Sequence, residues 1–302
     1  MLKLTGRLYT AADNPPVLAL LKEIYHVGGP PVYPTAGEFD WWQCIDNEPG
    51  GMGRARLWFE GDRLIGVSYP HSGHVDLMVH PHYTYVTHPM LAWAEKNRLI
   101  DTGPETILTT FSFAGDRTRN AVLRERGYRR QNDFYALRRR VVADSLPPAP
   151  LPPGYFIRQL RGEADLEQRV ASHRSAFPHT RVSLPGYRRA LTTASYRPDL
   201  DLVVTAPDGV IAAFTTIWYD ADNRIATFEP VGVHADHRRK GLARAVMVEG
   251  LRRLQALGAR QAFLNSHFDN RAANRLYDAL GFRELDRLYG WEKRLRDGHT
   301  QP

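Results

Sequence analysis

The sequence contains a single cysteine, Cys44, among 302 residues. One cysteine cannot form an internal disulfide, so a disulfide framework is excluded and a reducing, cytoplasmic location is expected. No apolar run approaches about 18 residues, so we expect no transmembrane helix. The first residues lack the apolar block of a signal peptide. Neither a cysteine cluster nor an HExxH motif is present, and the sequence therefore indicates no metal site.

Acidic residues are fewer than basic ones: 33 Asp and Glu stand against 40 Lys and Arg, for a formal net charge of +7. A basic balance alone produces only non-specific attraction to nucleic acid. The basic residues are scattered, and we interpret the run Arg138–Arg140 as a solvated strand end or as the approach to a linker. We therefore expect no nucleic-acid partner. The hydrophobic fraction of 43% is sufficient for real cores, and the length is sufficient for two domains.

Residues 227–245 carry the most informative pattern. Thr227–Val233 is rich in β-branched and apolar residues and predicts a strand, which a polar, basic turn follows. Gly241 opens a long amphipathic helix, and the turn contains the pattern Arg238-x-x-Gly241-x-Ala243. Small residues let an anion approach the backbone, where the free N–H groups of a helix's first turn point at it. The pattern predicts a phosphate-binding loop; the alternative is an ordinary strand–helix turn with a solvated basic face.

A second pattern lies downstream, and it reads Asn270-x-x-Ala273-x-x-Leu276-Tyr277-x-x-x-Gly281-Phe282. It predicts a helix that ends at a glycine C-cap. The apolar run at 261–265, between the two helices, predicts a parallel strand. Together, these patterns resemble the acyl-CoA-binding core of the GCN5-related N-acetyltransferase (GNAT) family, over about the last half of the chain. Ala235, where the family often has proline, and Ala243, where glycine is more frequent, depart from the family pattern.

The resemblance implies that acetyl-CoA is the cosubstrate and that its pantetheine arm pairs with the backbone of Val231 and Val233. The N–H group of Val231 would face the thioester oxygen, where it could stabilise an oxyanion. The loop would hold the pyrophosphate through main-chain N–H groups and cationic side chains. The residues of this loop are Arg238, Arg239, Lys240, Gly241, Leu242, Ala243 and Arg244.

Glu229 is the candidate general base. It stands in an otherwise apolar strand, two residues before Val231, where burial would favour proton abstraction near neutrality. The alternative is a structural carboxylate paired with an arginine, and His234 and His267 are the next candidates for the base.

Tyr277 and Asn270 are the remaining candidates for the site. The resemblance places the tyrosine hydroxyl near the CoA sulfur and implies a general acid, whereas helical spacing alone also fits a core aromatic residue. Asn270 would hydrogen-bond the pantetheine amide by the same resemblance, or it is merely the N-cap of its helix.

The chain also contains an internal repeat. The proline-rich segment 143–154 cannot sustain a helix or a central strand and predicts a semi-rigid linker. On either side of it, Gly127 and Gly281 stand 154 positions apart, and the same offset relates Asn120 to Asn274. The constant offset predicts an ancient duplication. We expect an α/β fold of two tandem GNAT-like domains, similar to acetyltransferases of the mycothiol synthase type. Each domain is a mixed sheet flanked by helices, and the predicted boundaries are 1–142, 143–154 (linker) and 155–302.

The first half lacks the candidate chemical residues. The offset places Thr84, Thr87 and Pro89 where the second half has Arg238, Gly241 and Ala243, and it places Val75 and Leu123 at the positions of Glu229 and Tyr277. We interpret this half as a degenerate copy that shapes the active cleft. Phe39, Trp41 and Trp42, in an apparently irregular stretch, could line that cleft; the alternative is that they are core or interface residues.

Two functions fit these observations. The first is an N-acetyltransferase that moves acetyl from acetyl-CoA to a primary amine of a small molecule or peptide, by direct attack in a ternary complex. The alternative is a non-catalytic acyl-CoA-binding or regulatory module. The presence of both Glu229 and Tyr277 favours the enzyme. The sequence does not determine the acceptor or the oligomeric state.

Overall fold

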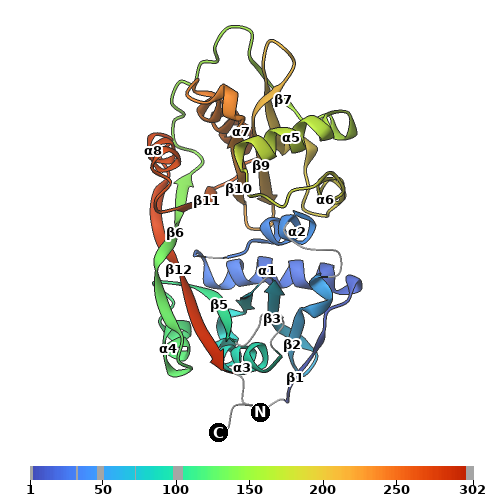
Figure 1. Ribbon diagram of the computed structural model, residues 1–302, viewed down its shortest axis with the longest axis vertical. Helices are drawn as coiled ribbons and strands as arrows, with labels where there is room; N and C mark the ends of the chain where they lie inside the picture. The colour runs from blue at the N-terminus through green and yellow to red at the C-terminus, as the bar shows by residue number, and fades with distance from the viewer. Residues whose placement is uncertain (1–2, 32, 46–50, 72, 98–104, 297–302) are drawn as a thin grey trace.

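Helices and strands alternate in two similar runs along the chain (Figure 1). The computed structural model describes residues 3–31, 33–45, 51–71, 73–97 and 105–296. The elements of the first half are β1 (Leu4–Leu8), η1 (Ala11–Asp13), α1 (Asn14–Gly28), α2 (Ala36–Ile45), η2 (Gly51–Arg54), β2 (Arg56–Glu60), β3 (Arg63–His71), β4 (His74–Val79), η3 (Pro81–Val86), α3 (Thr87–Asn97), β5 (Glu105–Phe113), α4 (Arg117–Glu125) and β6 (Arg129–Val141). Those of the second half are β7 (Phe156–Gln159), η4 (Gly162–Asp165), α5 (Leu166–Ala176), α6 (Leu184–Ala190), η5 (Pro198–Leu200), β8 (Asp201–Thr205), β9 (Ile211–Asp220), β10 (Ile225–Val233), η6 (Ala235–His237), α7 (Leu242–Ala256), β11 (Gln261–His267), α8 (Arg271–Ala279) and β12 (Arg283–Arg296).

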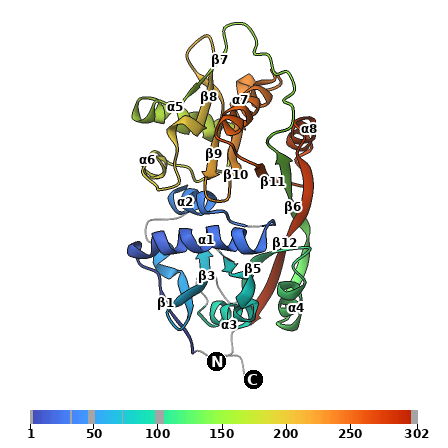
Figure 2. The same cartoon turned by 180° about the vertical axis from the view of Figure 1, so that it is seen from behind.

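The strands form one mixed sheet in the order β1-β2-β3-β4-β5-β12-β6-β11-β10-β9-β8-β7. The last strand of each half has changed places: β6 pairs with β11 of the second half, and β12 pairs with β5 of the first. These two strands also pair with each other, and both views show them running together along one flank of the molecule (Figures 1 and 2). Each half therefore completes the sheet of the other.

The predicted repeat is confirmed at the level of single hydrogen bonds. Asn120 Nδ2 donates to the carbonyl groups of residues 113 and 114, and Asn274 Nδ2 donates to those of residues 267 and 268. The cap of α4 is Asp116, which accepts from the N–H of residue 119, and the cap of α8 is Asn270, which accepts from the N–H of residue 273. Each pair is related by the same 154-position offset, so the two halves share local structure as well as sequence.

The strands predicted at 227–233 and 261–265 and the helices predicted after Gly241 and Asn270 agree with β10, β11, α7 and α8 within a few residues, but α2 was missed. Residues 36–45 are helical, and nine of the ten are buried. A helix that is buried on all sides has no polar face, so its sequence lacks the amphipathic period by which helices are recognised. Both views place α2 between α1 of the first half and the sheet of the second (Figures 1 and 2). A Cβ atom at Gly37 would lie 2.3 Å from the Trp218 side chain, so glycine permits this close approach.

Arg138–Arg140 lie at the end of β6, before the linker, as predicted, but the prediction that this run is solvated was wrong. Strand β6 is an interior strand of the sheet, and the side chains of Arg138 and Arg140 are buried. Arg138 donates to Asp278 at 2.6 Å, and Arg140 donates to the carbonyl of Leu280, just after α8. A cation is favourable at a helix C-terminus, where the carbonyl groups lack internal partners. The basic run therefore anchors α8 to the exchanged strand.

The proline-rich segment 143–154 contains no helix or strand. Three of its apolar residues, Leu146, Ala149 and Leu151, pack against the core beneath α7. The segment therefore lies on the second half rather than projecting from it. Within the described ranges of the chain, none of the helices combines the length and the apolar character that crossing a membrane requires.

Candidate active site

The site is built where β10 separates from its parallel neighbour. Strand β10 pairs with β11 only over Ile225–Thr227, although both strands continue beyond that point. Its pairing with β9 also shifts register between Phe228 and Val231, which is a β-bulge. Beyond Thr227, the edge of β10 that faces β11 thus no longer pairs with β11. Its backbone groups are placed to hydrogen-bond an extended ligand arm, as a sheet edge does.

A pocket of about 570 Å³ opens at this separation. From the second half, it is lined by Glu229, Val231, Asn270 and Tyr277, so the structure brings four of the predicted site residues together. The first half contributes the opposite wall, whose members include Tyr33, Trp41, Trp42, Tyr69, His71, Asp76, Phe111 and Tyr135. The pocket is therefore shared between the halves.

Glu229 is held by side chains of the first half. Trp42 Nε1 donates to Glu229 Oε1 at 3.0 Å, and the carboxyl of Glu38, also on α2, interacts with that of Glu229. Glu38 is 1% exposed and accepts from the N–H of Thr35 at 2.7 Å. Burial raises the pKa of Glu38. Because two close carboxyl groups do not readily ionise together, this pair is suited to hold one proton between them.

Tyr277 lies on α8 and is 8% exposed. It packs in the core beneath α7, as the core interpretation predicts, and it also lines the pocket; the general-acid role stays a prediction. Burial raises the pKa of Tyr277 to about 12. The hydroxyl is therefore protonated throughout the physiological range and can donate a proton or a hydrogen bond.

The N-cap interpretation of Asn270 is confirmed. Its side chain accepts a hydrogen bond from the N–H of Ala273 at 3.2 Å. Asn270 also lines the pocket, so its Nδ2 group is placed to donate a hydrogen bond to a ligand bound there. Contact with a pantetheine amide stays a prediction.

The predicted phosphate loop follows the end of β10 and does not line the pocket, nor does Val233. Arg239 has φ +63° and Gly241 has φ +76°. These two left-handed positions lead directly into the first turn of α7, whose free N–H groups can bind an anion, and we refer to this stretch of backbone as the nest. A positive φ is strained for an arginine, and such strain is concentrated at functional sites. A Cβ added at Gly241 would meet nothing within 4 Å, so the approach to this backbone is open.

Cationic side chains surround the nest without being neutralised. Arg238 donates to the carbonyl of Ala176, Lys240 to the hydroxyl of Tyr155, and Arg244 to the carbonyl of Pro148. In the part of the chain that the structure describes, these three cations form no ion pair. By contrast, the side chain of Leu242 is 1% exposed in the core, so only its backbone can contact a ligand.

The corresponding part of the first half has the same separation of strands and a pocket beside it, but different residues stand at the candidate positions. Strand β4 pairs with β5 only at His74, so these strands also separate, and a pocket of about 330 Å³ lies beside Val79 and Thr87. Thr87 has φ −54°, in the right-handed region, where the second half has its left-handed glycine. Val75 and Leu123 are fully buried in the core. At the positions related by the 154-residue offset, the described part of the first half therefore has no equivalent of the left-handed glycine, the candidate base or the candidate acid.

Two further histidines were candidates for the base. His267 lines the pocket, whereas His234 does not, and its ring accepts from the N–H of Asp236 at the start of η6. Sequence reasoning did not consider His173, which also lines the pocket. Burial and the neighbouring Arg169 lower the pKa of His173 to about 3, so its ring is neutral.

Comparison with known proteins agrees with this geometry. Residues 167–282 match the model of the acetyltransferase (GNAT) family, and this range includes the loop and Tyr277. Two curated relatives extend the likeness to most of the chain. The chain therefore contains an acetyltransferase domain of the GNAT type. The mycothiol acetyltransferase of Streptomyces avermitilis is 27% identical over 285 residues, which cover 91% of both chains. That of Nocardiopsis dassonvillei is 29% identical over 274 residues, 79% of this chain and 81% of the relative.

Solved structures show that this acetyltransferase has the tandem GNAT fold. A tandem GNAT protein from the clavulanic acid biosynthesis pathway superposes with a TM-score of 0.69 and 16% identity, and the match covers 100% of each chain. A GCN5-related N-acetyltransferase from Sphaerobacter thermophilus gives a TM-score of 0.65 and 19% identity, with 100% and 99% covered. The predicted fold of two tandem GNAT-like units is thereby confirmed.

Proposed function

We propose that this acetyltransferase moves the acetyl group of acetyl-CoA to the primary amine of a small molecule, by direct attack in a ternary complex. The observation that carries the proposal is the pocket between the halves. It places Glu229, Val231 and Tyr277 around one space, at the point where β10 and β11 separate.

The cosubstrate fits the second half along the length of β10. The backbone nest at Arg239 and Gly241, ringed by cations, suits the pyrophosphate of CoA. The unpaired side of β10, including Val231 and Val233, suits the amide groups of pantetheine. The thioester would then lie beside Glu229, in the pocket. We propose that the second half alone binds the cosubstrate, with residues 1–142 acting as a degenerate domain, 143–154 as the linker and 155–302 as the catalytic domain.

The pocket supplies each group that acyl transfer requires. The acceptor nitrogen attacks the thioester carbon, and Glu229 takes the proton that the amine loses, directly or through water. The N–H of Val231 donates to the oxyanion that forms. As the carbon–sulfur bond breaks, the hydroxyl of Tyr277 protonates the departing thiolate. This transfer needs no metal ion.

The acceptor is held by the first half. A cavity of about 570 Å³ lies within the range of small-molecule sites, and residues from both halves line it. Its wall consists of aromatic side chains from α2 and the neighbouring strands, together with the carboxylate of Asp76. The two relatives are named for mycothiol, so the amine precursor of that thiol belongs in any acceptor panel. We propose a cytoplasmic location, where acetyl-CoA is available and the buried, free Cys44 stays reduced.

The test is turnover against a panel of amines. The protein is incubated with acetyl-CoA and amino sugars, small alkyl amines, peptide N-termini and the mycothiol precursor, and both CoA release and acetylated product are measured. We expect one small-molecule class to be acetylated, with product and CoA formed in equal amounts. Preference for peptide N-termini would contradict a small-molecule acceptor. Binding of acetyl-CoA without turnover of any amine would instead favour the non-catalytic acyl-CoA-binding module.

A further inference from the structure

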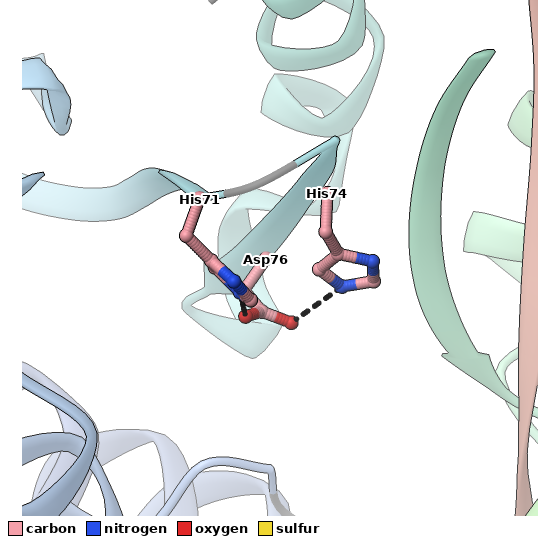
Figure 3. Close-up of side chains that lie close together, drawn as sticks. All are labelled: His71, His74 and Asp76. Atoms are coloured by element: carbon pink, nitrogen blue, oxygen red, sulfur yellow. Dashed lines mark hydrogen bonds and ion pairs between the residues drawn. The ribbon is translucent and has the colours of Figure 1, made fainter. Parts of the chain in front are cut away.

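The β3–β4 hairpin presents two histidines and an aspartate on one face, at the end that reaches the shared pocket (Figure 3). His71 and His74 are directly opposite each other across the hairpin. Asp76 stands two residues beyond His74 on the same strand, and side chains two apart on a strand share a face. The register of this hairpin therefore brings all three side chains together.

The potential ligand atoms of the three residues converge. His71 Nε2 lies 2.8 Å from one carboxylate oxygen of Asp76, and His74 Nε2 lies 3.1 Å from the other (Figure 3). All three ligand atoms lie within 4.8 Å of one another. Metal–ligand bonds of about 2.0–2.1 Å in a tetrahedral arrangement separate ligand atoms by roughly 3.3 Å. Small side-chain rotations would bring the three groups to that spacing.

The surroundings also orient one ligand. His74 Nδ1 lies 2.9 Å from the hydroxyl of Thr109, and that hydroxyl donates to the carbonyl of Gly73. With the hydroxyl hydrogen on Gly73, the Thr109 oxygen accepts from Nδ1–H, so Nε2 is the ring nitrogen that faces Asp76 and would bind the ion. A histidine ligand typically donates its second N–H in this way, which fixes the ring and its tautomer. His74 and Asp76 are 9% and 4% exposed, so these two groups are sheltered from bulk water, whereas the side chain of His71 is 31% exposed.

We propose that His71, His74 and Asp76 bind a divalent first-row transition-metal ion of the Zn²⁺ class. Two imidazole groups and one carboxylate are a ligand set that such ions accept. Three protein ligands leave at least one coordination position open, as in sites that bind water or substrate. His71 and Asp76 line the pocket, so the open position faces the space opposite Glu229. The ion lies in the acceptor wall and takes no part in the acetyl transfer described above.

Metal binding can be measured without any activity assay. Protein without a histidine tag is stripped with a chelator and titrated with Co²⁺, whose visible absorption reports tetrahedral coordination, and Zn²⁺ is then titrated by calorimetry. We expect one equivalent per chain for both ions and no heat with Mg²⁺, because imidazole ligands do not suit that hard cation.

Three variants and a control locate the site. H74A and D76N should lose the Co²⁺ absorption and bind Zn²⁺ at least roughly 100-fold more weakly, whereas T109V should weaken binding by roughly 10–100-fold. H82A removes an exposed histidine outside the cluster and should bind like the wild type. Circular dichroism shows whether each variant is folded. A wild-type protein that gives no tetrahedral Co²⁺ spectrum would overturn the proposal and leave a hydrogen-bonded cluster only, as would H74A and D76N proteins that bind with unchanged affinity.

Discussion

The bond between Trp42 and Glu229 makes the base depend on the first half, and Trp42→Phe tests this dependence. The substitution keeps an aromatic ring but removes the N–H that donates to Glu229 Oε1 at 3.0 Å. A donor stabilises the ionised form of a carboxylate, so its loss favours the protonated form. A protonated carboxyl cannot accept a proton from the amine. The acidic limb of the pH–rate profile should therefore move to higher pH.

The size of this displacement follows from the bond. A hydrogen bond to a charged group contributes roughly 1.5–3 kcal/mol, and one pKa unit corresponds to about 1.36 kcal/mol. The full loss would move the limb by about one to two pH units. Because Glu229 lines an accessible pocket, water replaces part of the donor, and we expect a displacement of about one unit. At alkaline pH, the rate should return close to that of the wild type.

The assay is kcat/KM against pH with one fixed amine, so that ionisation of the acceptor affects every protein equally. Trp41→Phe is the matched control. Trp41 also lines the pocket and is buried, but its indole packs against the rings of His173, Tyr187 and Trp218. Both substitutions remove a similar volume. An unmoved acidic limb in Trp42→Phe, or an equal displacement in both variants, would refute the reasoning.

Three further predictions concern the base and acid, the loop and stability. Glu229→Gln should lower turnover by roughly 10²–10⁴-fold with acetyl-CoA affinity nearly kept, and Tyr277→Phe should lower it less, because water can protonate the thiolate; wild-type rates in Glu229→Gln would move the base elsewhere. Calorimetry on the full chain should saturate near one equivalent of acetyl-CoA, and Gly241→Glu should abolish this binding. Gly209→Glu is the control, since Gly209 also has a positive φ, +85°, and an open Cβ position. Binding of a second equivalent would contradict the interpretation of the first half as degenerate. Burial raises the pKa of Asp165, but hydrogen bonds from two arginines outweigh burial and lower the pKa to about 2. The stabilising effect of the ionised carboxylate is therefore complete above about pH 4 and is lost as pH falls through 2. The unfolding midpoints of Asp165→Asn and the wild type should converge at the acid end, and a gap that stays constant with pH would show that this ion pair contributes little.

The local sequence determined the second half's loop and helices. A left-handed position requires glycine at 241, a helix cap requires a short polar side chain at 270, and an amphipathic period marks α7. Each requirement is met by residues close together in the chain, so a single sequence displays it. The repeat was also visible, because a constant offset of 154 needs no knowledge of contacts.

Tertiary structure decided the exchange of β6 and β12, because either half could have closed its own sheet with its own last strand. It also decided the partners of the candidate base. Trp42 is 187 positions away from Glu229 in the chain, on a helix whose complete burial removed its amphipathic signal. The His71, His74 and Asp76 cluster depends on the register of one hairpin, where a slip of one residue would send the ligands to opposite faces. Composition and spacing describe what a segment can form, but the side chains that meet across a pocket are set by how distant segments pack.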